Sequence, residues 1–257
     1  MLRLRVLLLL LAGCAHSPAV PRADVVSLML RHVKADGPNH RHMLRLARLV
    51  PSFSKAERAS AAIVEAAVLL HDATKEDGAG TPYERFCTHH QQGAALAKAE
   101  LPSLGYSAAD SARVAEAIEQ HMGPCGENRF MTSFCKREYP APSTPEARVL
   151  FDLDMLDLMT VDGVVKVVTL RQRNAEFARE PVKDSALTGA DSAWKSVTDA
   201  RQVLVTTTGQ ACGDAVQAHT KAFLDGVDFA VATTVESFEA SAKAYLSAHP
   251  LPACVTP

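Results

Sequence analysis

The segment from Ala59 to Leu70 most constrains how this chain can fold. It is apolar almost all round except for Glu65, and His71 and Asp72 follow it at once. A helix that is hydrophobic on every face has to be buried inside a protein. The sequence therefore predicts a central helix here, with two ion-binding side chains at its buried end.

The rest of the chain also favours helices. Hydrophobic residues make up 47% of the 257 residues and aromatic ones only 5%, and the alternation typical of strands is not found. We therefore predict an all-α fold. The expected helices begin near Asp24 and Asn39 and include residues 59–72, 87–101, 108–121 and 145–159, with further helices to about His249. Pro51 is expected to end the second helix, and Gly209 and Gly213 to interrupt the C-terminal ones.

The formal charge excludes one class of partner. The net charge is −2, and no basic stripe with interleaved aromatic residues is present. Proteins that bind nucleic acids need such positive surfaces to meet the phosphate backbone. We expect no nucleic-acid partner.

The first residues are typical of an export signal. Two arginines precede an apolar run over residues 6–11, which is far below the roughly 20 residues that a transmembrane helix needs. Leu11-Ala-Gly-Cys14 resembles the lipobox of bacterial lipoproteins, in which the cysteine is lipidated and becomes the mature N-terminus. This resemblance implies a signal peptide over residues 1–13, a lipid anchor at Cys14 and a tether over residues 14–23. An ordinary secretory signal is the alternative.

Ala15 bears on the membrane that would hold the anchor. A residue other than Asp beside the lipidated cysteine resembles the outer-membrane class of lipoproteins. The expected location is the cell envelope, at the outer membrane and facing the periplasm.

Export would also allow disulfides to form. Cys125 and Cys135 share a loop rich in glycine and proline, and Cys212 and Cys254 flank the last helical region. We predict these two bridges. A zinc site at the first pair is the alternative, but no Cys-x-x-Cys spacing accompanies it.

His71 and Asp72 have the chemistry of metal ligands. An imidazole and a carboxylate together suit a borderline divalent cation such as Mn, Fe, Ni or Zn. Adjacent residues in a helix point about 100° apart, so the two can converge on one ion only at a helix end. Lys75, one turn after His71, is placed to meet a phosphate oxygen. For His71 alone, a histidine satisfied within the core is the alternative.

Residues 39–159 resemble the HD-domain superfamily of metal-dependent phosphohydrolases. His42, with Arg45 three residues later, is similar to the first-helix histidine of that family. Val68-Leu-Leu-His-Asp-Ala-Thr-Lys75 resembles its paired motif with a trailing lysine. The resemblance implies an HD-like helical bundle over residues 24–160, with additional C-terminal helices over residues 161–257 packed on or beside it.

Other residues extend the resemblance. His89 and His121 resemble the extra histidines of members that bind a second metal, with His40 and His90 as alternatives to His42 and His89. Asp154 matches the final aspartate of the family, with Asp152 as the alternative. The implied metal ligands are His42, His71, Asp72, His89, His121 and Asp154, for one or two ions.

The resemblance implies hydrolysis of a phosphate ester in the envelope, on a nucleotide or another small phosphorylated substrate. Asp72, Lys75 and Arg45 are the implied catalytic residues. No Gly-Tyr-Pro follows His121, so the subgroup that acts on cyclic dinucleotides is not supported. The alternatives are an inactive HD-fold lipoprotein that serves as a binding or scaffold module, and a helical lipoprotein whose histidines only fill polar niches.

Overall fold

The computed structural model describes residues 22–123, 135, 139–173, 180–188 and 192–256, and these residues form an all-helical fold. The α-helices are α1 (Arg22–Met29), α2 (Pro38–Ala56), α3 (Ala61–Leu70), α4 (Thr74–Asp77), α5 (Pro82–Glu100), α6 (Ala108–Gln120), α8 (Pro145–Met159), α9 (Val161–Arg173), α10 (Ala193–Val203), α11 (Thr207–Gly226) and α12 (Val235–Ala248). Short helical turns lie at Leu101–Leu104, Asp184–Thr188 and Ala253–Val255. Among these described ranges there is no strand, and no helix has both the length and the hydropathy to cross a membrane.

The predicted central helix is confirmed as α3. Its residues from Ala66 to Leu70 are all buried, as are Ile63 and Val64. Helices α1, α2, α6 and α8 pack around it. The helix therefore delivers His71 and Asp72 into the interior.

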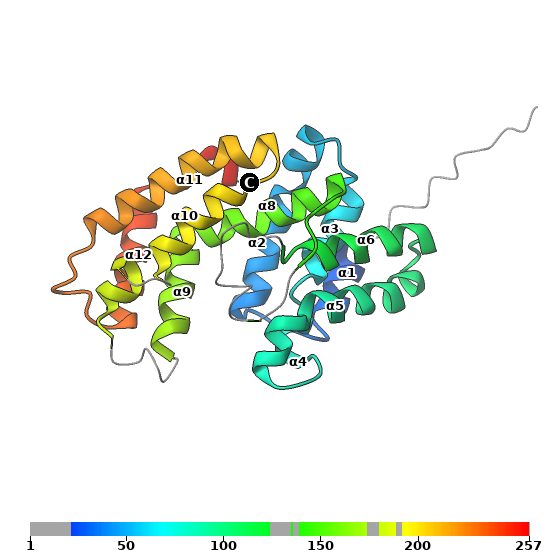
Figure 1. Ribbon diagram of the computed structural model, residues 1–257, viewed down its shortest axis with the longest axis horizontal. Helices are drawn as coiled ribbons and strands as arrows, with labels where there is room; N and C mark the ends of the chain where they lie inside the picture. The colour runs from blue at the N-terminus through cyan, green and yellow to red at the C-terminus, as the bar shows by residue number, and fades with distance from the viewer. Residues whose placement is uncertain (1–21, 124–134, 136–138, 174–179, 189–191, 257) are drawn as a thin grey trace, which may run out of the picture.

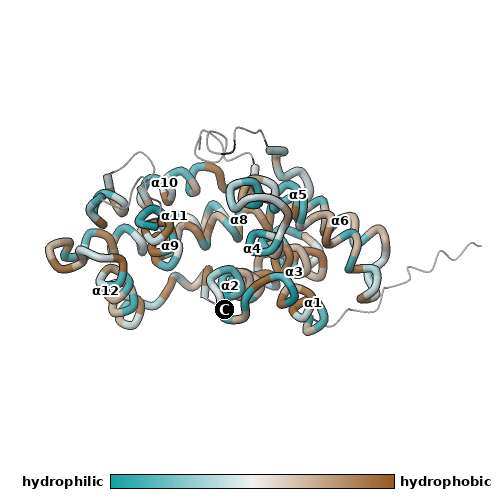
Figure 2. The backbone as a smooth tube through the Cα atoms, turned by 90° about the horizontal axis from the view of Figure 1, so that it is seen from below, coloured by the Kyte–Doolittle hydropathy of each residue, from teal (hydrophilic) through white to brown (hydrophobic). Residues whose placement is uncertain are grey.

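Helix α8 lies between two groups of helices (Figure 1). Helices α2, α3 and α6 pack against it from the N-terminal part of the chain, and α10 and α11 from the C-terminal part. Eleven of its fifteen residues are buried, which requires neighbours on both sides. Figure 2 shows α8 in the middle of the molecule, with hydrophobic residues recurring along it. The buried apolar side chains of both groups form one continuous cluster.

Asp152 joins α8 to the start of α11. Its Oδ1 accepts from the Val205 amide at 2.9 Å, and its Oδ2 accepts from the Thr206 amide and hydroxyl at 2.8 and 2.6 Å. A Cβ at Gly209 would lie 2.1 Å from Asp152 Oδ2. The expectation that Gly209 and Gly213 interrupt helices is therefore wrong, because both lie inside α11, where the close approach of a side chain leaves no room for a Cβ.

The expectation that Pro51 ends its helix is also wrong. α2 continues through Pro51 to Ala56. The buried face of α2 runs on past the proline to Phe53, which is 1% exposed. Burial of that face outweighs the roughly 3 kcal/mol that an internal proline costs a helix.

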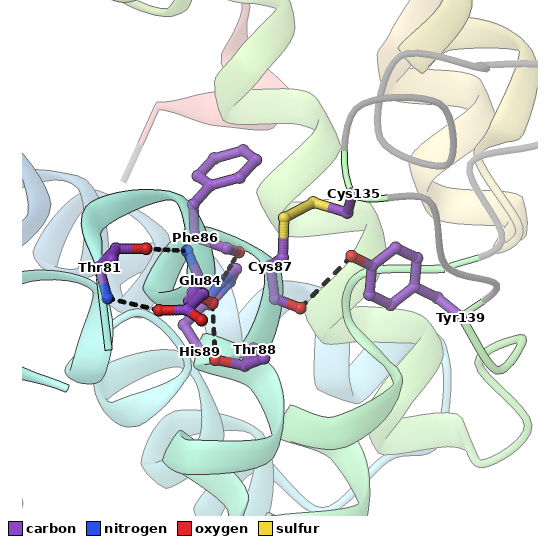
Figure 3. The surroundings of a disulfide bond; sticks show 8 residues. All are labelled: Thr81, Glu84, Phe86, Cys87, Thr88, His89, Cys135 and Tyr139. Atoms are coloured by element: carbon purple, nitrogen blue, oxygen red, sulfur yellow. Dashed lines mark hydrogen bonds between the residues drawn. A yellow bond between two sulfur atoms is a disulfide. The ribbon is translucent and has the colours of Figure 1, made fainter. Parts of the chain in front are cut away.

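Two disulfides cross-link the described residues. Cys87, on α5, is bonded to Cys135, and the Tyr139 hydroxyl donates to the Cys87 carbonyl at 3.4 Å (Figure 3). The predicted Cys125–Cys135 bridge is wrong, because Cys135 lies against α5 and is bonded to Cys87. Cys125 lies outside the described residues, as do Cys14, the expected signal peptide and most of the expected tether.

The second predicted bridge, between Cys212 and Cys254, is present. Replacing both cysteines by alanine should lower the free energy of unfolding by about 3 kcal/mol, because a constraint on the unfolded chain is lost. Urea denaturation of the oxidised protein measures this change. An unchanged midpoint and slope would show that this cross-link adds nothing to stability.

Candidate metal centre

Polar side chains from five parts of the fold meet at the buried end of α3. The six predicted ligands all lie there: His42 from α2, His71 and Asp72 directly after α3, His89 from α5, His121 after α6 and Asp154 from α8. His71, Asp72, His89 and His121 are fully buried. Such a concentration of polar groups inside a helical core needs a compensating partner.

Asp72 lies at the middle of this cluster. Its Oδ1 is 3.3 Å from His89 Nε2, 3.6 Å from His71 Nε2 and 3.9 Å from His121 Nε2. Its Oδ2 is 3.9 Å from His42 Nε2. The carboxylate therefore faces the Nε2 atoms of all four histidines, as a group that bridges two ions would.

The remaining distances define two overlapping sets of donors. His42 Nε2 lies 3.1 Å from Asp154 Oδ1 and 3.3 Å from His71 Nε2. Two groups of three side chains each offer one donor atom within 4.8 Å of the others: His42, His71 and Asp154, and His71, Asp72 and His121. His89 Nε2 is 3.0 Å from His121 Nε2 and so adjoins the second group.

Three of the histidines are oriented by their own helices. The Nδ1 of each lies 2.6–2.8 Å from the backbone carbonyl three residues earlier. A carbonyl can only accept, so Nδ1 carries the proton and Nε2 of the neutral ring presents a lone pair. These pairs are His71 with Val68, His89 with Phe86 and His121 with Ile118.

Burial keeps these three rings neutral. It lowers the pKa of His71 and His89, and it lowers the pKa of His121 to about 4. Three lone pairs therefore point at one another and at Asp72, whose buried Oδ1 has the Lys75 ammonium 2.6 Å away but no aligned hydrogen bond. A divalent cation relieves this arrangement, and a set of nitrogen and carboxylate donors suits a borderline metal.

His42 has a different environment from the other three histidines. Its Nδ1 lies 2.7 Å from Asp157 Oδ2, and its Nε2 faces Asp154. Burial would lower its pKa, but the two carboxylates outweigh burial and raise it. The same contacts hold the pKa of Asp154 and Asp157 well below the usual range, against the effect of burial. The two carboxylates therefore favour a proton on His42, and an ion would compete with that proton.

Arg45, which the resemblance implies as a catalytic residue, lies beside Asp157. Its guanidinium donates to both oxygens of Asp157 at 2.8 Å, on the Nδ1 side of His42. It therefore lies away from the Nε2 atoms that face the cluster. Asp157 was not among the predicted site residues, although its position three residues after Asp154 puts both on one face of a helix.

Lys75 lies at the exposed edge of the cluster. Its ammonium is 2.6 Å from Asp72 Oδ1 and 2.7 Å from Oδ2. The side chains of Lys75 and Asp154 are 20% and 19% exposed, whereas the histidines around them are buried. Access from solvent is therefore on the side of Lys75 and Asp154.

The alternative residues lie elsewhere. His40 Nδ1 accepts from the Asp36 amide at 3.0 Å. His90 packs edge-on against the ring of Tyr139, with centroids 5.1 Å apart. Asp152 faces the start of α11. His42, His89 and Asp154 are thus the members of each pair that reach the cluster.

Acid should destabilise the metal-free protein. Burial lowers the pKa of His121 to about 4, against an unfolded value of about 6.5. Between these values the unfolded chain binds a proton that the folded chain does not, so the free energy of unfolding falls by about 3 kcal/mol as pH drops. The lowered pKa values of His71 and His89 also make acid destabilising, whereas the raised pKa of His42 works against this effect. Urea denaturation of chelator-treated protein at about pH 7 and about pH 4 measures this, and equal stabilities would contradict it.

Two comparisons with known proteins found similarities to this chain. Residues 39–159 match the family model described as HD domain. A crystal structure of a protein from Lactobacillus plantarum, solved as a Northeast Structural Genomics target, has a TM-score of 0.52 to this chain. The two are 19% identical, and the match covers 79% of this chain and 93% of the other, which shows a shared fold. No curated protein matches the chain.

Proposed function

We propose that the chain, whose residues 39–159 match the HD-domain family model, is a divalent-metal-dependent phosphohydrolase that cleaves a phosphate ester. Proteins with this domain are generally metal-dependent hydrolases. One observation carries the proposal: the lone pairs of three buried neutral histidines converge on a buried carboxylate. A cluster that only filled polar niches would pair donors with acceptors.

The six proposed ligands are His42, His71, Asp72, His89, His121 and Asp154, for one or two ions of Mn, Fe, Ni or Zn. A divalent ion there would supply a Lewis acid that polarises a phosphoryl oxygen and lowers the pKa of a water. His71, His89 and His121 hold their Nε2 atoms toward the ion without rearrangement. Asp72 draws the two groups of donors together.

Lys75 supports phosphate as the group acted on. Its ammonium lies 2.6 Å from Asp72 Oδ1. With Asp72 holding an ion, the ammonium at the exposed edge would be placed to meet a phosphate oxygen and to offset charge that develops in the transition state. The proposed substrate is a small phosphorylated molecule, a nucleotide or another phosphate ester, that enters beside Lys75 and Asp154.

An envelope location is part of the proposal. The N-terminal sequence supports export and lipid attachment at Cys14, although that part of the chain lies outside the described residues. The two disulfides support the same location, because disulfides persist in oxidising compartments.

Purified protein, loaded in turn with Mn, Fe, Ni and Zn, tests the proposal against a panel of phosphomonoesters, phosphodiesters and nucleotides. We expect turnover that depends on the metal and stops with a chelator. Metal that raises the melting temperature without any turnover would favour the scaffold alternative. Protein that binds no metal would refute both.

A further inference from the structure

His42 owes its orientation to a different helix. The other three histidines donate Nδ1–H to carbonyls of their own helices, which any folded helix provides. His42 Nδ1 instead meets Oδ2 of Asp157, which lies 115 residues away in the sequence and on α8. The orientation of the His42 ring therefore depends on the packing of α2 against α8.

Asp157 is itself held in one plane. Arg45 donates from Nε to Oδ1 and from Nη2 to Oδ2, both at 2.8 Å. Such a two-point contact fixes both the position and the plane of a carboxylate. The Asp157 side chain is 7% exposed, so little water competes for it. Arg45 and His42 both belong to α2, and Asp157 bridges them.

We propose that Asp157 is a positioning residue that fixes the Nδ1–H tautomer of His42, so that its Nε2 lone pair points at the ion, and that Arg45 acts through Asp157. A carboxylate only accepts, so it requires His42 Nδ1 to be the donor. A carboxylate partner also makes the imidazole a stronger metal ligand. The inference rests on the metal-binding part of the proposed function.

Asparagine at position 157 has the right shape and the wrong hydrogen-bonding pattern. If its NH₂ replaces Oδ2, it donates toward His42 Nδ1 and enforces the opposite tautomer, with a proton on Nε2. If its NH₂ replaces Oδ1, it opposes the Nε–H of Arg45 and breaks the clamp. Either orientation of the amide therefore removes a hydrogen bond, to His42 in the first case and from Arg45 in the second.

The test is the Zn²⁺ affinity of the Asp157→Asn protein, measured by competition with a chelator. We expect it to be about 10–100-fold weaker than wild type. Asp152→Asn is the matched control, since Asp152 is a buried carboxylate on the same helix that faces α11. Its Zn²⁺ affinity should stay within about twofold of wild type. In Zn²⁺-loaded protein labelled with ¹⁵N-histidine, the Nδ1–H signal of His42 should move or vanish in Asp157→Asn and persist in Asp152→Asn.

A second variant keeps the inference falsifiable. Arg45→Met leaves the carboxylate but removes its clamp, and should cost a smaller, several-fold loss of affinity. An Asp157→Asn protein that binds Zn²⁺ as tightly as the Asp152→Asn control would overturn the role of Asp157. If Asp157→Asn does not fold, unchanged affinity in Arg45→Met overturns the inference. Wild type that binds none of Mn, Fe, Ni and Zn would refute the proposed function too, whereas Zn²⁺ binding that both variants retain would refute only the positioning role.

Discussion

Asp72→Asn should lower phosphohydrolase activity on the order of 10³-fold and remove most of the bound metal. Asp72 is the group that faces all four histidines, and its buried carboxylate carries the negative charge that pairs with Lys75. An amide of the same size keeps the packing but takes away the negative charge and one oxygen donor. It would also leave the Lys75 ammonium without its counter-charge inside the cluster.

Values of kcat/KM and metal content by elemental analysis measure this effect together. Asp77→Asn is the matched control, because Asp77 is an exposed carboxylate on α4 that pairs with His32 at 2.8 Å. It should keep full activity and metal. If Asp72→Asn kept its metal but lost activity, Asp72 would have a chemical role without being a principal ligand. If it kept both, the assignment of the centre would be wrong.

Gly209→Ala should lower the free energy of unfolding by about 4 kcal/mol, from overpacking combined with weakened hydrogen bonds to a charged group. The new Cβ would lie 2.1 Å from Asp152 Oδ2 and 2.9 Å from the Thr206 hydroxyl oxygen. Asp152 cannot move away without giving up its hydrogen bonds to Val205 and Thr206 at the start of α11. The clash therefore acts on the contact that joins α8 to the C-terminal helices.

The melting temperature should fall by about 10 °C for a chain of this size. Gly226→Ala is the control, since Gly226 ends the same helix and a Cβ there would meet nothing within 4 Å. Its stability should stay the same or rise slightly, because alanine favours helix over glycine. Equal melting temperatures for wild type and Gly209→Ala would show that Asp152 is not fixed as described.

Features encoded in a short stretch of sequence could be predicted. The all-round apolar pattern of residues 59–70 identified α3, and the placement of His71 and Asp72 after it identified the centre. The start of α5 was equally readable, since Thr81 and Glu84 form a capping box, but the sequence pattern predicted this helix only from residue 87.

Features that depend on distant partners could not be predicted. In the sequence, a glycine at position 209 looks the same whether it breaks a helix or makes room for Asp152. Only the position of α8 distinguishes the two roles. Pro51 is tolerated because other helices bury the face of α2 that continues past it. The partner of Cys135 depended on its position beside α5 in the fold. Arg45 and Asp157 meet because α2 lies against α8, which no local pattern indicates.

Helix α8 is buried on both of its sides. The molecule is therefore poorly divided at Met159, where the match to the HD-domain model ends. A chain cut after Met159 would retain all six candidate ligands. It would also expose the side of α8 that α10 and α11 cover and strip Asp152 of Val205 and Thr206. Gene fusion or recombination at that boundary would therefore transfer all six candidate ligands on an incomplete core, and residues 39–159 and the C-terminal helices should be inherited as one piece.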